Sequence, residues 1–210
     1  MPDFAHEIRF GRLDGKVICG VDEVGRGPLA GPVVAAAAIL PQDFPAALQD
    51  GIKDSKKMSA KAREDVFGPL MESCHYAIAE ASVAEIDTLN ILWASMLAME
   101  RAVGLLQSLS AVKKIHVALV DGNRAPKINC TAHPIVKGDD KSLSIAAASI
   151  IAKVHRDRLM KKLAEEFPLY GWEHNAGYGT SQHLGALTQH GVTVWHRASF
   201  APVRMAIEQH

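Results

Sequence analysis

The stretch Val21-Asp22-Glu23-Val24-Gly25-Arg26-Gly27-Pro28 places two neighbouring carboxylates between an apolar run and a glycine-rich turn. The preceding Val17-Ile18-Cys19 predicts the end of a β-strand, and the glycines predict a tight loop after it. Carboxylates beside an apolar strand are costly unless they meet cations or hydrogen-bond donors. A loop containing Gly25 and Gly27 can approach a ligand closely because no Cβ intervenes. We therefore expect a metal site on one side of this stretch and a phosphate or sugar contact on the other.

The segments around this stretch predict a mixed α/β fold. Strands are expected over residues 16–22, 33–40, 76–83, 114–120 and 128–136, and helices over 60–71, 84–109, 142–167 and 181–190. We expect residues 1–14 and 42–58 to be irregular, and residues 193–210 are ambiguous. The short connection between the first two strands favours a hairpin. This order of elements is typical of a mixed sheet with helices on its faces.

Composition limits the class of protein. The 210 residues are 48% hydrophobic, which predicts one packed domain with a small appendage. Lys plus Arg equals Asp plus Glu at 23 each, so a polyanionic partner would need basic residues segregated onto one face. The three cysteines are far apart and form no CxxC pair, which predicts reduced thiols. With no signal region and no long apolar run, we expect a soluble, cytoplasmic protein.

Further acids lie at later strand ends. Asp121 follows Val120 and precedes Gly122, and Asp139 and Asp140 follow Gly138. If the first and fourth strands are parallel neighbours, their carboxylates meet at one end of the sheet, where α/β ligand sites form. Clustered carboxylates repel one another unless hard cations neutralise them, and oxygen ligands suit Mg²⁺ or Mn²⁺.

Each acid also has a simpler interpretation when it is taken alone. Asp22 and Glu23 can be an ordinary polar strand end, Asp121 a turn residue, and Asp139 or Asp140 a helix cap. Adjacent strand residues point to opposite faces of a sheet, so Asp22 and Glu23 share a site only if the strand ends or bulges there.

Several ordered motifs resemble ribonuclease HII, the type 2 ribonuclease H family. The resemblance rests on Gly20–Pro28, Lys53–Lys57, Val120–Gly122, Lys137–Asp139 with Ser144–Lys153, Gly177–Thr180, and His196–Pro202. These matches run in order over residues 16–203. Two positions depart from the family pattern: Ala176, where relatives often carry a lysine, and His155, where a threonine is common.

The resemblance implies a ribonuclease H-like five-stranded mixed sheet flanked by helices, with a small helical C-terminal appendage. We expect a catalytic domain over residues 1–168 and an extension over 169–210. The implied activity is endonucleolytic cleavage of the RNA strand of RNA–DNA hybrids. The family also nicks duplex DNA 5′ of embedded ribonucleotides, leaving 3′-hydroxyl and 5′-phosphate ends. We expect a monomer that acts on either substrate and contacts no membrane.

The resemblance also implies roles for particular residues. The family's catalytic and metal-binding acids correspond to Asp22, Glu23, Asp121 and Asp139, with Asp140 as the alternative fourth acid. Its Gly-Arg-Gly element corresponds to Gly25, Arg26 and Gly27, and its junction-sensing tyrosine to Tyr178.

Phosphodiester hydrolysis needs an attacking water and a stabilised leaving oxygen, which two metal ions can provide together. We therefore expect two Mn²⁺ or Mg²⁺ ions with substrate bound, with Asp22 bridging them. Lys56 and Lys57 are our preferred phosphate contacts because their loop is bounded by glycine. His174, His183, His190 and His196 show no zinc-like spacing, and we expect structural or peripheral roles for them.

Two other functions remain open from the residues alone. The glycines of residues 25–31 loosely resemble a nucleotide-binding loop, although Pro28 and Pro32 disfavour the helix that should follow. A non-catalytic nucleic-acid-binding module would need aromatic residues, which make up only 6% of the chain. Metal-dependent cutting of a duplex containing one ribonucleotide excludes both.

Overall fold

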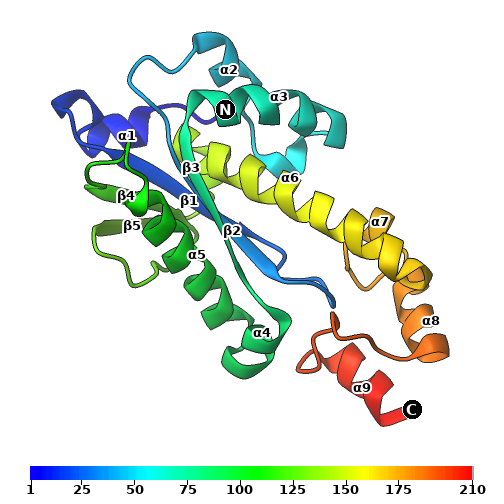
Figure 1. Ribbon diagram of the computed structural model, residues 1–210. Helices are drawn as coiled ribbons and strands as arrows, with labels where there is room; N and C mark the ends of the chain where they lie inside the picture. Colours follow the sequence, from blue (N-terminus) through cyan, green and yellow to red (C-terminus); the bar gives the residue numbers. More distant parts are fainter. Residues whose placement is uncertain (210) are drawn as a thin grey trace. The chain divides into compact units, whose positions relative to one another are not determined.

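The computed structural model describes residues 1–209 (Figure 1). The strands are β1 (Ile18–Val24), β2 (Val33–Ile39), β3 (His75–Ala81), β4 (Val117–Asp121) and β5 (Thr131–Ile135). The α-helices are α1 (Ala5–Arg9), α2 (Ala46–Gly51), α3 (Ala60–Ser73), α4 (Val83–Leu89), α5 (Ile91–Ser108), α6 (Leu143–Glu166), α7 (Trp172–Asn175), α8 (Ser181–His190) and α9 (Ala201–Gln209). Short 3₁₀ turns are η1 (Arg12–Asp14), η2 (Ser55–Lys57), η3 (Gly138–Asp140) and η4 (Pro168–Tyr170).

The five strands form one mixed sheet in the order β3-β2-β1-β4-β5. β1 and β2 form the predicted antiparallel hairpin, and β1 is parallel to β4, which is parallel to β5. The predicted fold class is confirmed, including the side-by-side parallel placement of the first and fourth strands.

The chain divides into two compact units, each considered by itself below. The first comprises residues 1–24, 34–80 and 96–154, and the second comprises residues 25–33, 81–95 and 155 to the C-terminus. The predicted domain division between residues 168 and 169 stays a prediction.

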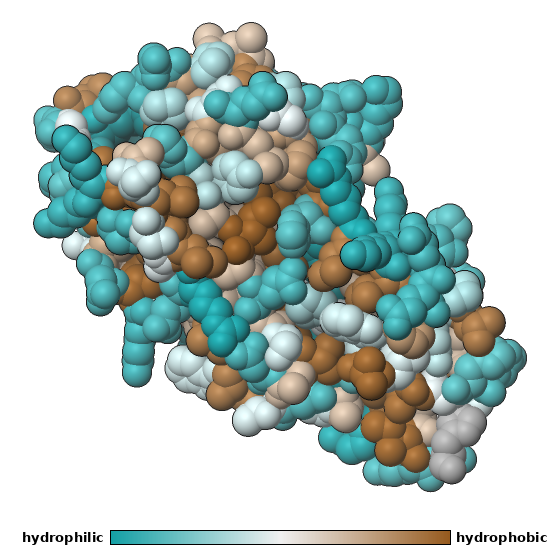
Figure 2. Space-filling view, in the orientation of Figure 1, coloured by the Kyte–Doolittle hydropathy of each residue, from teal (hydrophilic) through white to brown (hydrophobic). Residues whose placement is uncertain are grey.

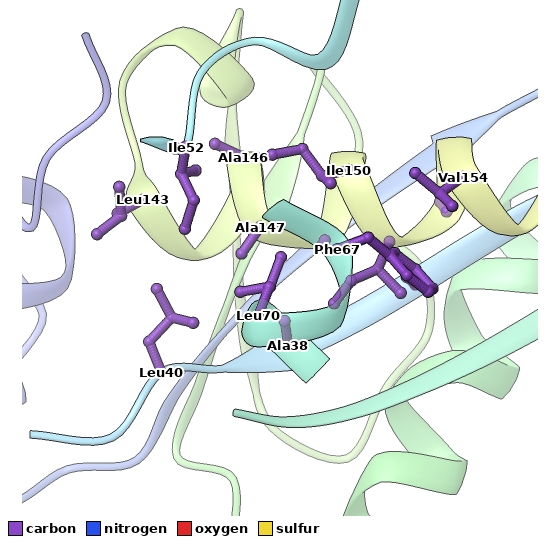
Figure 3. Packing of buried hydrophobic residues seen from close by; sticks show 14 of the residues in the cluster. Ala38, Leu40, Ile52, Phe67, Leu70, Leu143, Ala146, Ala147, Ile150 and Val154 are labelled. Carbon is purple, nitrogen blue, oxygen red and sulfur yellow. The ribbon is translucent and has the colours of Figure 1, made fainter. Parts of the chain in front are cut away.

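The core of the first unit lies between β2, α3 and the first half of α6. β2 is buried along its whole length, and Val34, Ala36 and Ala38 pack against α3 and α6. Figure 3 shows Ala147 of α6 next to Leu70 of α3, and Ala146 and Ile150 in the same cluster on the side of Ile52. Small residues on both sides bring α6 close to the sheet, as its run of alanines predicts.

The core of the second unit surrounds Trp172. Its indole is fully buried and stacks on Tyr170 with ring centroids 5.2 Å apart. Apolar residues of α8 and α9, including Leu187 and Val203, complete this cluster.

Two predicted irregular segments contain helices, so those predictions were wrong. In residues 1–14, Glu7 of α1 is fully buried, and its Oε1 accepts hydrogen bonds from Ser142 Oγ (2.7 Å) and Ser144 N (2.9 Å). In residues 42–58, the Asp54 side chain accepts a hydrogen bond from the Lys56 backbone N–H and begins η2. These short helices depend on such contacts rather than on an apolar repeat.

Two further predictions were wrong in their boundaries. The helix expected over 84–109 is broken at Asn90, whose φ is 67° and whose side-chain oxygen accepts the Leu92 and Trp93 N–H groups. The first strand does not end at Asp22 but continues to Val24. The ambiguous C-terminal segment contains α9, and His210 lies outside the described residues.

No helix within residues 1–209 is both long enough and apolar enough to span a membrane. Figure 2 shows hydrophilic and hydrophobic residues interspersed over the visible face.

Candidate active site

The acids at the ends of β1 and β4 lie where these two strands separate. The last pair of their parallel ladder is Val21 with Val120, so Asp22 and Asp121 are the next residues on each strand. β1 stays paired with β2 as far as Val24. Two carboxylates therefore meet at the carboxyl ends of parallel strands, as the sequence predicted.

Asp22 is buried on the α6 face of the sheet, because its ladder partner Ala36 packs on that face. Its Oδ1 accepts a 2.7 Å hydrogen bond from the Glu23 N–H, and Ser149 of α6 donates a hydrogen bond to the same carboxylate. Burial, followed by the charges of Glu23 and Asp121, raises the pKa of Asp22 well above its usual value. The strand end thus concentrates negative charge that a cation would stabilise.

Asp121 is tied to the turn that carries Asp139. Its Oδ1 accepts a 2.7 Å hydrogen bond from the N–H of Gly138. A Cβ at position 138 would lie 2.6 Å from Ile145 Cδ1 and 3.3 Å from Asp121 Oδ1, so glycine leaves room for this close approach. Burial, followed by the charge of Asp121, raises the pKa of Asp139.

Lys56 and Lys57 differ in their contacts with the acids. The Lys56 Nζ lies 3.6 Å from Asp139 Oδ2. Burial lowers the pKa of Lys56, but the charges of Asp22 and Asp139 outweigh burial and raise it. Lys57 Nζ donates instead to Asp140 Oδ1 at 2.6 Å, and this bond lowers the pKa of Asp140. Asp139 thus belongs to the buried acid cluster, whereas Asp140 pairs with Lys57 at the surface.

A cavity of about 330 Å³ opens at this cluster. It is lined by Asp54, Lys56, Lys57, Asp121, Lys137, Asp139 and Asp140. Its walls carry both carboxylates and ammonium groups, which is the combination that metal and phosphate binding require.

Glu23 departs from the predicted geometry. β1 contains no bulge, because Asp22 pairs with Ala36 and Glu23 pairs with Ala35 in regular register. Adjacent residues of a regular strand point to opposite faces, so the expectation that the strand ends or bulges here was wrong. The Glu23 charge still raises the pKa of Asp22, so the two carboxylates remain electrostatically coupled.

Across residues 1–209, no three His, Cys, Asp or Glu side chains are already arranged to hold a metal ion together. The donor set nevertheless fits a divalent cation. Asp22, Asp121 and Asp139 supply hard oxygen donors whose mutual repulsion such an ion relieves.

The predicted glycine-rich turn belongs to the second unit, where two buried arginines bind its carbonyl groups. Arg197 donates to the carbonyl oxygens of Gly25 (2.6 Å), Arg26 (3.1 Å) and Gly31 (2.9 Å). Arg156 Nε would lie 2.2 Å from a Cβ at Gly25, whose φ is 93°. The turn therefore requires glycine at position 25.

Tyr178 extends from the same unit into solvent. Its side chain is 47% exposed, and its ring edge would lie 3.3 Å from a Cβ at Gly27. The turn and the tyrosine, predicted separately as substrate contacts, are thus neighbours.

The sequence did not reveal several residues that support the predicted site. Ser149, Arg156 and Arg197 each support a predicted site element. His183 and His196, for which structural or peripheral roles were expected, are buried with their Nε2 atoms 3.0 Å apart. Ser149 and Arg197 lay within quoted motifs, but nothing in their spacing showed what they bind.

Comparison with known proteins identifies the family. Residues 19–203 match the family model of ribonuclease HII. The chain belongs to the ribonuclease HII family. Ribonuclease HII 1 of Methylibium petroleiphilum is 54% identical over 193 residues, covering 91% of this chain and 93% of that protein. Ribonuclease HII of Granulibacter bethesdensis is 54% identical over 210 residues, covering 99% and 92%.

Solved structures agree with this assignment. The chain resembles ribonuclease H2 of Pyrococcus horikoshii with a TM-score of 0.74 and 28% identity, covering 91% of this chain and 97% of that one. Bst-RNase HIII, solved in complex with Mn²⁺, shares the fold with a TM-score of 0.76 and 21% identity, covering 92% and 70%. As a ribonuclease HII family member, the chain is an endonuclease, which implies cleavage of the RNA strand of RNA–DNA hybrids.

Proposed function

We propose that this ribonuclease HII family member hydrolyses the RNA strand of RNA–DNA hybrids and also nicks duplex DNA 5′ of embedded ribonucleotides. The products carry 3′-hydroxyl and 5′-phosphate ends. The observation that supports this chemistry most strongly is the placement of Asp22 and Asp121 together where β1 and β4 separate.

Asp22, Asp121 and Asp139 would hold two divalent ions, Mn²⁺ or Mg²⁺. Glu23 would complete this set from the other face of β1, which is no longer paired with β4 at this position, and its charge acts on Asp22. When bound, such a pair supplies the water activation and leaving-group stabilisation that phosphodiester hydrolysis needs. Ser149 orients the Asp22 carboxylate, and the Gly138 N–H orients that of Asp121. Both bonds fix the acids before substrate arrives, which favours catalysis by preorganised groups.

The predicted site residues other than the acids would bind the nucleic acid. Lys56 combines an exposed ammonium group with proximity to the acids, so we assign it a phosphate beside the cut. Lys57 must exchange its bond to Asp140 for a phosphate, which makes its contribution smaller. Arg26 and Gly27 are exposed and offer backbone for reading the 2′-hydroxyl, and the buried Gly25, whose carbonyl accepts from Arg197, would hold them in place. Tyr178 offers an exposed ring for stacking next to the junction.

The decisive experiment is metal-dependent cleavage of a DNA duplex that contains one ribonucleotide. We expect a single nick on the 5′ side of that ribonucleotide with Mn²⁺ or Mg²⁺ and none with EDTA. Asp121→Asn should abolish the nick while the folded structure is retained, whereas the matched control Asp140→Asn should keep most activity. Tight binding without cleavage under either metal would instead favour a non-catalytic binding module.

A further inference from the structure

A directed chain of hydrogen bonds crosses the buried core of the second unit and ends on the backbone of Tyr178. The Thr193 N–H donates to His196 Nδ1 at 2.9 Å. The Nε2 atoms of His196 and His183 lie 3.0 Å apart, and His183 Nδ1 lies 3.0 Å from the carbonyl oxygen of Tyr178. Each contact has the length of a normal hydrogen bond.

The direction of this chain follows from its two ends. A backbone N–H can only donate, so His196 Nδ1 must accept and a neutral His196 carries its proton on Nε2. That proton is donated to His183 Nε2, which also accepts from Trp172 Nε1 at 3.2 Å. His183 therefore carries its proton on Nδ1 and donates it to Tyr178 O.

Both imidazoles are held neutral by their surroundings. His183 and His196 are buried, at 0% and 4% exposure. Burial and the neighbouring His183 lower the pKa of His196 to about 4. Near neutral pH both rings are therefore in the neutral tautomers that this series of hydrogen bonds requires.

Tyr178 combines a fixed backbone with an exposed ring. Its N–H donates to Asn175 O at 2.9 Å, and its carbonyl accepts from Thr180 N as well as from His183. The phenol ring is in contrast half-exposed. A fixed backbone restricts the positions that the exposed ring can reach, which lowers the entropic cost of recognising a ligand.

The segment that carries His196 also binds the glycine-rich turn. Arg197, next to His196, donates to the carbonyls of Gly25 and Arg26. Leu29 N–H donates to Gly177 O at 2.7 Å, beside Tyr178. The neighbouring residues His196 and Arg197 therefore support both the tyrosine and the turn.

We propose that His183 and His196 are positioning residues that aim Tyr178 at the RNA–DNA junction and so set the preference for a single embedded ribonucleotide over a continuous hybrid. This inference rests on the proposed function, because it assumes that Tyr178 contacts substrate. Neither histidine touches the substrate or the acids in this scheme, so their effect reaches cleavage only through Tyr178.

A double-mutant cycle tests this dependence. The measured quantity is the preference ratio, which is kcat/KM for a duplex with one ribonucleotide divided by kcat/KM for an RNA–DNA hybrid. Tyr178→Ala and His196→Asn should each lower this ratio by about threefold or more. The double variant should fall no lower than Tyr178→Ala alone, and the exposed His174→Asn should leave the ratio unchanged.

The possible outcomes distinguish a failure of the proposed function from a failure of the positioning role of the histidines. A wild-type protein that cleaves neither substrate overturns the proposed function. A Tyr178→Ala variant with the wild-type ratio overturns the substrate contact of Tyr178 and this inference with it. If Tyr178→Ala lowers the ratio but His196→Asn does not, or if their effects multiply in the double variant, only the positioning role fails. Equal losses on both substrates in His196→Asn also overturn it, because they indicate a purely structural role.

Two further measurements keep the test valid if His196→Asn does not fold. His183→Asn removes the ring nitrogen that lies 3.0 Å from the Tyr178 carbonyl oxygen, and it should lower the ratio in the same direction. Imidazole ¹⁵N NMR of the wild-type protein at neutral pH should show His196 protonated on Nε2 and His183 on Nδ1. The opposite tautomer at either residue would overturn the hydrogen-bond chain.

Discussion

The backbone N–H of Gly138 donates a 2.7 Å hydrogen bond to Oδ1 of Asp121 and joins the end of β4 to the turn carrying Asp139. A Cβ at position 138 would lie 2.6 Å from Ile145 Cδ1 and 3.3 Å from Asp121 Oδ1. Gly138→Ala should therefore displace both acids and lower kcat/KM on a ribonucleotide-containing duplex by about 10²-fold. Gly104→Ala is the matched control, since its Cβ would meet nothing within 4 Å. Wild-type activity in Gly138→Ala would contradict the proposed site.

Asp22→Asn should stabilise the metal-free protein while abolishing cleavage. Burial and neighbouring charges raise the pKa of Asp22 in the folded state, so its ionisation opposes folding increasingly as pH rises above the ordinary value of 3.8. In EDTA at pH 8 the variant should melt at least about 2 °C higher than wild type. The difference should shrink as pH falls through the raised pKa and vanish below 3.8, where both states are protonated. A lower melting temperature for the variant at pH 8 would show that the buried charge is already compensated.

Metal binding should stabilise the wild-type protein through the same acids. With Mn²⁺ at 100 times its Kd, the expected gain is about 2.7 kcal/mol. In a chain of this size that gain raises the melting temperature by about 5 to 10 °C, and EDTA should reverse it. Asp121→Asn should lose most of this shift. Equal shifts in both proteins would place the bound ion elsewhere.

The strands β1, β2 and β4 could be predicted from the sequence because they are apolar runs, and β1 and β4 carry carboxylates at their ends. The 33–40 run became β2 in the predicted hairpin, and the placement of the first and fourth strands brought Asp22 and Asp121 together. The helix α1 could not be predicted, because its stability depends on Glu7 binding Ser142 and Ser144, far along the chain. The supporting role of Arg197 could not be predicted either. Its partners are backbone carbonyl groups, which every residue carries, so the sequence does not show which of them it binds.

Ala176→Gly should raise stability. Ala176 ends α7 with φ 48° and ψ 31°, in the left-handed region that costs a non-glycine residue about 1 to 2 kcal/mol. The variant should melt about 2 to 4 °C higher, or more, in a thermal scan. The Ala176 carbonyl that accepts from Arg156 is backbone and survives the change. Ala84→Gly, at an exposed position of α4, should shift the melting temperature in the opposite direction, and a fall in both variants would contradict the prediction.

Arg197→Lys should destabilise the protein even though it keeps the charge. Lysine cannot reproduce the fork that reaches three carbonyl oxygens, so at least one buried acceptor loses its donor. We expect a loss of about 1 to 3 kcal/mol in the free energy of unfolding, measured by urea denaturation. Arg204→Lys, on the exposed side of α9, should change it by less than about 0.5 kcal/mol. An unchanged midpoint for Arg197→Lys would show that the turn does not depend on these bonds.

Gly20 shows how little room the fold leaves for a side chain between β1 and α6. A Cβ there would lie 2.0 Å from the carbonyl carbon of Ser144, so the backbone of α6 rests directly on that of β1. Even a single methyl group would push the helix bearing Ser149 away from the strand bearing Asp22. In a saturation library selected for ribonucleotide removal, position 20 should therefore tolerate no replacement, although glycine has no side chain to take part in the proposed chemistry. A substitution at an exposed position leaves the spacing between α6 and β1 unchanged, whereas any side chain at position 20 alters it.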